Sequence, residues 1–153
     1  MSAIKNRNLN NHDNWATPDW LYQELDAEFD FDFDPCPLNL DEITPDVDGL
    51  VIPWGKRNFV NPPYGRKLKD AFVKRSIEEA RTGSLCVCLI PVSTSTALFH
   101  DYIQPNATEI RFLRGRIKFT GTDTRGVAVD PKNPLARPMH DSMVVVFDGR
   151  VRS

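Results

Sequence analysis

Residues 84–92 constrain the fold more than any other segment, because they read Ser-Leu-Cys-Val-Cys-Leu-Ile-Pro-Val and are almost wholly apolar. A strand that is apolar on both faces must be covered by other elements on both sides. Residues 67–81, which precede it, place apolar side chains at helical spacing, and Gly83 then provides a signal for a helix C-terminus. A chain of 153 residues that is 41% apolar can bury such a layered core in one compact domain.

The remaining periodicities extend this alternation of helices and strands. Residues 19–29 follow the helix-start signal Thr17-Pro18 and carry apolar residues at four-residue spacing, which predicts a helix. A short helix is also predicted over residues 96–103. Strands separated by helices indicate an α/β fold with a largely parallel sheet. The other strands are predicted over residues 29–34, 50–52, 58–60, 109–113, 116–120 and 142–148.

Two segments lack such periodicity. Residues 1–14 are polar and rich in asparagine, which predicts a frayed or disordered arm ahead of a single domain over residues 15–153. Residues 121–141 hold three prolines and two glycines, and a connection of this length predicts a functional or mobile loop.

Composition excludes several classes of protein. The sequence has no run of about 18 apolar residues, so no membrane span is predicted. The N-terminus lacks the apolar core of a signal peptide. Cys36, Cys86 and Cys88 show no metal-ligand spacing, and the three histidines are scattered. We therefore expect a reduced, cytoplasmic protein without disulfides or a metal site.

The tetrapeptide Asn61-Pro62-Pro63-Tyr64 follows the apolar pair Phe59-Val60. Proline fixes φ and lacks an N–H, and a residue before proline is pushed towards extended geometry, so the carbonyls of this loop point outward. The Asn61 side-chain oxygen and the Pro62 carbonyl could then accept the two N–H groups of a planar amine, with Tyr64 covering its face. This pattern favours a methyltransferase acting on an exocyclic amino group. On these residues alone, a simple turn explains the tetrapeptide equally well.

Charge is unevenly distributed although the formal net charge is only −2. Residues 26–48 contain nine acidic residues and no lysine or arginine. Residues 56–81 contain eight basic residues against three acidic, and residues 111–137 contain seven against two. If these two basic segments share a face, they create a positive field for the phosphates of a nucleic acid. An ordinary solvated surface is the alternative.

Several short motifs occur in a fixed order along the chain: Trp15-Ala16-Thr17-Pro18, Phe33-Asp34-Pro35-Cys36, Asp48-Gly49-Leu50 with Trp54, Phe59-Val60-Asn61-Pro62-Pro63-Tyr64, Leu89-Ile90-Pro91-Val92 and Arg114-Gly115-Arg116-Ile117-Lys118-Phe119. This ordered set resembles the phage-type DNA N6-adenine methyltransferases, the phage Dam family, from Trp15 to about Phe147. The tetrapeptide alone is shared with glutamine and RNA amine methyltransferases. The resemblance implies a compact Rossmann-like methyltransferase sheet, S-adenosylmethionine as the methyl donor, and adenine in DNA as the acceptor.

On this resemblance, the catalytic loop consists of Asn61, Pro62, Pro63 and Tyr64. Two acceptors on the N6 hydrogens favour a more tetrahedral nitrogen, whose lone pair then points at the donor methyl group in line with its leaving group. Tyr64 is expected to stack on an adenine flipped out of the duplex. The proton can leave after methyl transfer, so neither a strong general base nor a metal ion is required.

The part of the site that is expected to hold the methyl donor departs from the usual methyltransferase pattern. A glycine-rich loop usually follows the first strand of a methyltransferase, whereas the turn Asp34-Pro35-Cys36-Pro37 has no glycine. Asp34 is expected to bind the methionine amino group or to orient the loop, unless it only faces solvent from an alternating strand. Only about twenty residues separate Cys36 from Asn58, so the sheet edge is expected to be abbreviated. The residues assigned to the cofactor are Trp15, Thr17, Pro18, Asp34, Pro35, Cys36, Asp48 and Asn61.

The cations assigned to DNA are Arg66, Lys67, Arg114, Arg116, Lys118 and Arg125. A separate target-recognition domain is not visible in the sequence, so recognition is expected to be short or relaxed, or to involve a second subunit of a homodimer. A bacterial or phage-infected cell is the expected setting. Two alternatives stay open: an amine methyltransferase acting on RNA or on a protein glutamine, and a non-catalytic cofactor- or DNA-binding module of the same fold.

Overall fold

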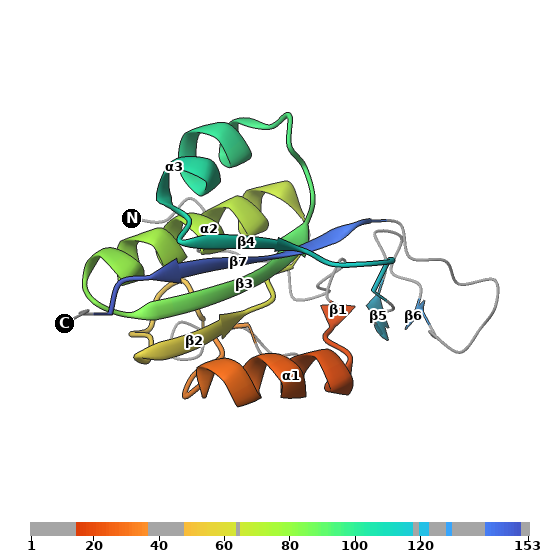
Figure 1. Ribbon diagram of the computed structural model, residues 1–153, viewed down its shortest axis with the longest axis horizontal. Coiled ribbons are helices and arrows are strands. Elements are labelled where there is room, and N and C mark those ends of the chain that lie inside the picture. Colours follow the sequence, from red (N-terminus) through yellow and green to blue (C-terminus); the bar gives the residue numbers. More distant parts are fainter. Residues whose placement is uncertain are drawn as a thin grey trace.

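The computed structural model describes residues 15–36, 48–63, 65–117, 120–122, 128–129 and 140–150. A four-stranded sheet has the order β2-β3-β7-β4, and a small sheet has the order β1-β5-β6 (Figure 1). The strands of the main sheet are β2 (Arg57–Val60), β3 (Leu85–Pro91), β7 (Ser142–Asp148) and β4 (Glu109–Phe112). Those of the small sheet are β1 (Trp15–Ala16), β5 (Thr120–Thr122) and β6 (Ala128–Val129). The helices are α1 (Asp19–Phe29), α2 (Arg66–Arg81), the π-helix η1 (Leu98–Ile103) and α3 (Gln104–Asn106).

Strand direction in the main sheet is mixed. The pair β2 and β3 is parallel, whereas β7 runs antiparallel to both β3 and β4. Three of the four strands share one direction and β7 alone is reversed. Because β7 lies between β3 and β4, two of the three ladders are antiparallel, so the sheet is mixed and the expected largely parallel sheet is wrong. An isolated parallel bridge joins Phe33 to Asn58 beyond β2. The carboxyl ends of the Phe33 segment, β2 and β3 consequently meet at one edge of the sheet.

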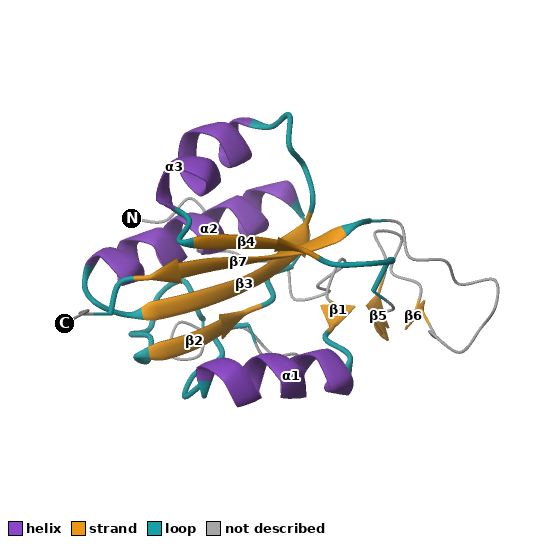
Figure 2. Ribbon diagram, viewed as in Figure 1, coloured by secondary structure: helices purple, strands orange, loops and turns teal. Residues whose placement is uncertain are grey.

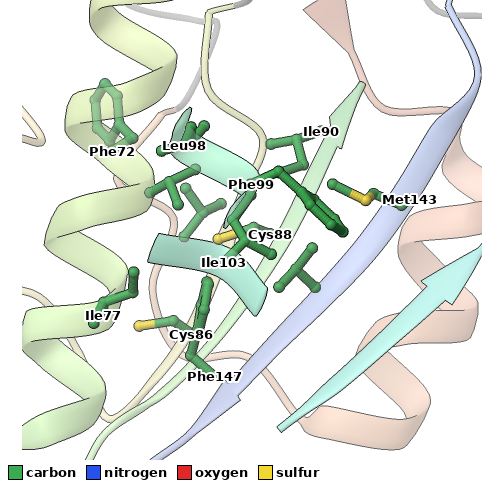
Figure 3. Packing of buried hydrophobic residues seen from close by; sticks show 13 residues of the cluster. Phe72, Ile77, Cys86, Cys88, Ile90, Leu98, Phe99, Ile103, Met143 and Phe147 are labelled. Atoms are coloured by element: carbon green, nitrogen blue, oxygen red, sulfur yellow. The ribbon is translucent and has the colours of Figure 1, made fainter. Parts of the chain in front are cut away.

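Helices cover both faces of this sheet, as Figure 2 shows. On one face, α1 packs Leu21, Leu25 and Phe29 against alternate residues of β3 and β7. On the other face, α2 and η1 pack over the remaining alternate residues of the same strands. Figure 3 shows this second cluster, which includes Phe72, Ile77, Phe99, Ile103, Cys86 and Cys88. The two-sided burial expected of residues 84–92 is confirmed, since every residue of β3 is buried.

The strand expected over residues 29–34 is wrong. Helix α1 continues to Phe29, and Asp30 ends it in the left-handed conformation with a φ of 53°. Asp is one of the few residue types other than glycine that adopt this conformation at low cost. Only Phe33 then makes a bridge. Its N–H and that of Asp32 both donate to the Arg57 carbonyl, and the Asp32 carboxylate accepts the Arg57 N–H at 3.0 Å.

The strand expected over residues 50–52 is also wrong, because these residues form a turn. The Asp48 carbonyl accepts the N–H groups of Val51 and Ile52, and Asp48 Oδ1 accepts that of Leu50 at 2.9 Å. Aspartate favours such side chain-to-backbone hydrogen bonds, and they compete with strand pairing.

Two further elements are shifted. The short helix expected over residues 96–103 is the π-helix η1, which continues into α3. The strand expected over residues 116–120 is not formed at residues 116 and 117, where Ile117 is buried under α1, and β5 begins at Thr120 and pairs with β1. The arm expected over residues 1–14 and most of the loop expected over residues 121–141 lie outside the described residues. Among the described helices, none combines the length and the apolar character that a membrane crossing requires.

Candidate active site

The sequence motifs converge at the carboxyl edge of the main sheet. The turn Asp34-Pro35-Cys36 follows the Phe33 bridge, and Asn61-Pro62-Pro63 directly follows β2. Figure 1 shows that the ends of β2 and β3 face the small sheet. In open α/β sheets, ligands bind outside the carboxyl ends of the strands. The topology therefore places the predicted donor turn and the predicted catalytic loop at the position where such folds hold ligands.

Asn61 is held in a well-defined position. Only 8% of its surface is exposed, and Pro62 and Pro63 after it are buried. Its Nδ2 donates a hydrogen bond of 3.0 Å to the Thr17 hydroxyl. Its Oδ1 is also buried. The structure thus brings together two residues that the sequence assigns to the site, Asn61 and Thr17, although 44 positions separate them.

The donor turn is stabilised by its own side chain and by a second turn. The backbone N–H of Cys36 donates to Asp34 Oδ1 at 2.8 Å. A β-carbon at Gly49 would overlap the carbonyl oxygen of Pro35, so only glycine permits this approach. Asp48, which precedes Gly49, is buried, with 6% of its surface exposed. Pro35, Cys36 and Asp48, all assigned to the cofactor, therefore lie together.

The Asp34 carboxyl has a shifted acidity. Desolvation by the surrounding protein raises its pKa to about 6, and the hydrogen bond from the Cys36 N–H opposes this rise. The residue as a whole is nevertheless exposed, and solvation of that exposed surface favours the carboxylate and works against the rise. The Asp34 carboxyl is thus easier to protonate than an ordinary aspartate.

Arg75 fixes the turn that follows Asp48, and sequence reasoning missed this role. Its guanidinium donates to the carbonyls of Leu50 at 3.2 Å and Ile52 at 2.9 Å. It also lies 5.0 Å from the ring centroid of Trp54 and pairs with Glu79 at 3.0 Å. The sequence counted Arg75 only as part of a basic segment. The one local signal was the Arg75–Glu79 spacing of four residues, which places both on one side of α2.

The assigned cations are placed unevenly. Arg66 and Lys67 are exposed in the first turn of α2, shortly after the catalytic loop. Arg114 and Arg116 are exposed, and Arg116 forms an ion pair of 3.1 Å with Asp141. Such solvent-exposed pairs contribute little stability. Tyr64, Lys118 and Arg125 lie outside the described residues, and of Trp15 only the backbone position in β1 is described.

Arg111 corrects the predicted distribution of positive charge. It binds the carboxylates of Glu28 and Glu109, and its guanidinium lies 5.3 Å from the ring centroid of Phe29. These contacts raise the pKa of Arg111, and the hydrogen bond from Arg111 lowers the pKa of Glu28. Arg111 was counted in the basic segment 111–137, but its charge is neutralised by neighbouring carboxylates.

All three cysteines are free thiols. Cys86 and Cys88 are buried in β3, and burial raises the pKa of Cys88 to about 12 and that of Cys86 further. Since a thiolate is the reactive form, neither is a candidate nucleophile. Within the described part of the chain, no cluster of histidine, cysteine, aspartate and glutamate side chains is arranged to hold a metal ion.

Comparison with known proteins agrees with the geometry. A family model described as DNA N-6-adenine-methyltransferase (Dam) matches residues 5–148. A DNA N-6-adenine-methyltransferase of Haemophilus phage HP1 (strain HP1c1) is 32% identical over 158 residues, which cover 97% of this chain and 86% of that protein. A DNA N-6-adenine-methyltransferase of Escherichia phage T1 is 30% identical over 144 residues, which cover 79% of this chain and 59% of that protein. No solved structure matches the chain.

Proposed function

This chain belongs to the DNA N-6-adenine-methyltransferase (Dam) family, and on that premise we propose that it transfers a methyl group from S-adenosylmethionine directly to the N6 amino group of adenine in DNA. The observation that carries the proposal is the anchored carboxamide of Asn61 in a proline-fixed loop at the carboxyl end of β2. We also assign the main sheet to the Rossmann-like class with an abbreviated edge. Three strands of one direction, helices on both faces and the single bridge at Phe33 support this assignment.

In the proposed reaction, Asn61 Oδ1 and the Pro62 carbonyl accept the two N–H groups of adenine N6. The nitrogen lone pair is otherwise delocalised into the ring, and these acceptors favour the tetrahedral geometry in which it can attack. Because both acceptors belong to a buried loop that does not need to reorganise, they stabilise the transition state more than water would. The N6 proton is lost to water after transfer. A target base has to leave the duplex to reach acceptors at this depth, and Tyr64 would stack on it there.

S-adenosylmethionine would supply a methyl group carried on a positively charged sulfonium centre. The charge at the edge of the sheet fits such a group, because the carboxylates of Asp34 and Asp48 belong to the two turns that pack together there. A cationic amino group beside Asp34 would offset the desolvation that raises the pKa of this carboxyl. We propose that Asp34 orients the donor through that contact. The other residues assigned to the cofactor beside these turns, Trp15, Pro18, Pro35, Cys36 and Asp48, would line the same pocket, whereas the Thr17 hydroxyl contacts the Asn61 amide.

We assign phosphate contacts to the exposed cations near the loop. Arg66 and Lys67 begin α2 immediately after the catalytic segment, so a flipped adenine and its flanking phosphates could be held at the same time. We assign further phosphate contacts to Arg114, Arg116, Lys118 and Arg125. Contacts of this kind position DNA without reading its sequence. The phage origin of the relatives supports a bacterial cytoplasm as the setting.

The experiment is labelled methyl transfer from S-adenosylmethionine to unmethylated DNA, RNA and bacterial protein in parallel, followed by digestion and identification of the methylated nucleoside or amino acid. The proposal expects N6-methyladenine from DNA. It also expects Asn61→Ala to lose transfer, whereas the matched control Asn106→Ala in α3 retains it. Labelling of RNA or protein alone would redirect the activity to that substrate, and cofactor binding without any transfer would identify a non-catalytic module.

A further inference from the structure

The hydrogen bond between Thr17 and Asn61 joins two separately built parts of the molecule. Asn61 ends β2 in the main sheet, whereas Thr17 directly follows β1 in the small sheet. The bond length is 3.0 Å, and it forms in a partly buried environment. Thr17 belongs to a motif that the sequence assigned to the cofactor. In the structure, its hydroxyl contacts the proposed catalytic amide.

Thr17 is held from both sides along the chain. Before it, β1 pairs with β5 through Trp15–Gly121 and Ala16–Thr120. After it, the Pro18 carbonyl accepts the N–H groups of Leu21 and Tyr22, both at 3.1 Å, at the start of α1. A residue before proline is also restricted to extended geometry. The backbone of Thr17 therefore has a defined position that does not depend on Asn61.

An asparagine carboxamide needs such an external partner. The last torsion of asparagine has a broad, roughly two-fold distribution, so burial of the side chain alone does not define where the oxygen points. The hydrogen bond from Nδ2 to the Thr17 hydroxyl holds the plane of the carboxamide, and in the described orientation Oδ1 points away from Thr17. A catalytic carboxamide that must accept a substrate N–H benefits from this, because rotation by half a turn would present Nδ2 to the amine.

We propose that Thr17 is a positioning residue for Asn61, and that the pairing of β1 with β5 sets the position of Thr17. This inference rests on the proposed function, since it assigns a role within the same reaction. It makes the small sheet part of the catalytic machinery, because Thr17 directly follows β1 and β5 holds β1 in place.

The test is a double-mutant cycle with Thr17→Val, Asn61→Ala and the double variant, with Thr17→Ser as the conservative control. Single-turnover methyl transfer to DNA is measured at saturating S-adenosylmethionine, and the Kd of S-adenosylmethionine is measured separately by calorimetry. We expect Thr17→Val to slow transfer about five- to tenfold, as expected for the loss of one hydrogen bond, with a Kd within about twofold of the wild type. Thr17→Ser should restore the rate, and adding Thr17→Val to Asn61→Ala should have no further effect.

Three results would overturn the proposal: an unchanged rate in Thr17→Val, a weakened Kd with an unchanged saturating rate, or losses that multiply in the double variant. The second result would identify Thr17 as a cofactor contact. If transfer by Asn61→Ala is too slow to measure, the same four proteins are compared by thermal unfolding. A coupling free energy of zero between the two positions would then contradict the contact itself. A wild-type protein that methylates no DNA would refute the proposed function. If the wild type methylates DNA and one of the three results above is found, only the positioning role of Thr17 fails.

Discussion

The loop after β2 and the turn after Phe33 lie at the same edge of the sheet, yet they are held in place by different means. The Asn61 loop continues a strand that is paired with β3 over four residues, and its amide is tied to Thr17. The turn Asp34-Pro35-Cys36 follows a single bridge and depends on an aspartate side chain and on Gly49. The acceptor side is therefore built into the sheet, whereas the donor side is assembled from loops that pack on it.

This contrast separates two kinds of variant. Changes on the donor side should weaken cofactor binding and leave the transfer rate at saturating cofactor nearly intact. Changes on the acceptor side should lower the rate and leave the cofactor Kd nearly intact. Five measurements test whether the effects on cofactor Kd and on transfer rate separate in this way.

The largest donor-side effect is expected from Gly49→Ala, because the added β-carbon would overlap the Pro35 carbonyl. Backbone displacement of this kind costs about 1–3 kcal/mol. The cofactor Kd should rise at least about tenfold. Isothermal calorimetry and thermal unfolding measure the two effects. Gly83→Ala is the matched control, since it strains a φ of 105° near the opposite end of β3 and should leave the Kd unchanged. An unaltered Kd in Gly49→Ala would contradict the packing of the two turns.

A smaller effect is expected from Arg75→Ala. This change removes the hydrogen bonds to the carbonyls of Leu50 and Ile52 together with the contact to Trp54. The expected loss is about 1–2 kcal/mol in the free energy of unfolding, with a cofactor Kd raised about fivefold. Arg81→Ala, an exposed arginine on the same helix, serves as the control. Equal effects of Arg75→Ala and Arg81→Ala on stability and on the cofactor Kd would show that the contacts of Arg75 with Leu50, Ile52 and Trp54 do not have this role.

The pH dependence of cofactor binding tests Asp34. Protonation removes the negative charge with which Asp34 would bind a cationic amino group. The affinity for the cofactor should therefore fall as pH drops below about 6, by at most about tenfold per pH unit. The free energy of unfolding changes with pH in the opposite direction to the cofactor affinity. Because the folded-state pKa is raised, the free energy of unfolding contributed by this group falls as pH rises from 3.8 to about 6. Calorimetric titrations from pH 5 to pH 8 should show the binding effect in the wild type and a flat profile in Asp34→Asn.

The smallest effect concerns DNA. The double variant Arg66→Ala and Lys67→Ala should weaken DNA binding and reduce the slope of log Kd against log salt by about 0.9 for each lost phosphate contact. Fluorescence anisotropy across a salt series measures this slope. Arg111→Ala is the matched control, because Glu28 and Glu109 already neutralise that cation. A slope changed equally by Arg111→Ala would contradict the assignment of the DNA-facing cations.

Sequence reasoning identified every element with a strong, long period, and the short strands β2 and β4 as well. Helices α1 and α2 and strands β3 and β7 are confirmed within a few residues of their expected bounds. The errors fall on short segments, where one hydrogen-bonding side chain decides the outcome. Asp48 converts residues 50–52 into a turn, and Asp30 ends α1 in a conformation that periodicity does not reveal.

The candidate site was predictable as a set of motifs but not as a set of contacts. The position of Asn61 at a strand end followed from the preceding apolar pair and the two prolines. The contact with Thr17 spans 44 positions, and the packing of Gly49 on Pro35 joins two turns across a long gap. Neither has a local signature, because both depend on how the small sheet and the second turn fold back onto the main sheet.

The central claim is that the Asn61 carboxamide acts in the transfer step. The most direct measurement is the single-turnover rate of methyl transfer to DNA at saturating S-adenosylmethionine for Asn61→Ala, compared with Gly49→Ala under the same conditions. The account predicts that Asn61→Ala is slower than wild type by about a hundredfold or more, with a cofactor Kd within about twofold, and that Gly49→Ala is nearly as fast as wild type once saturated. Wild-type transfer by Asn61→Ala would contradict it.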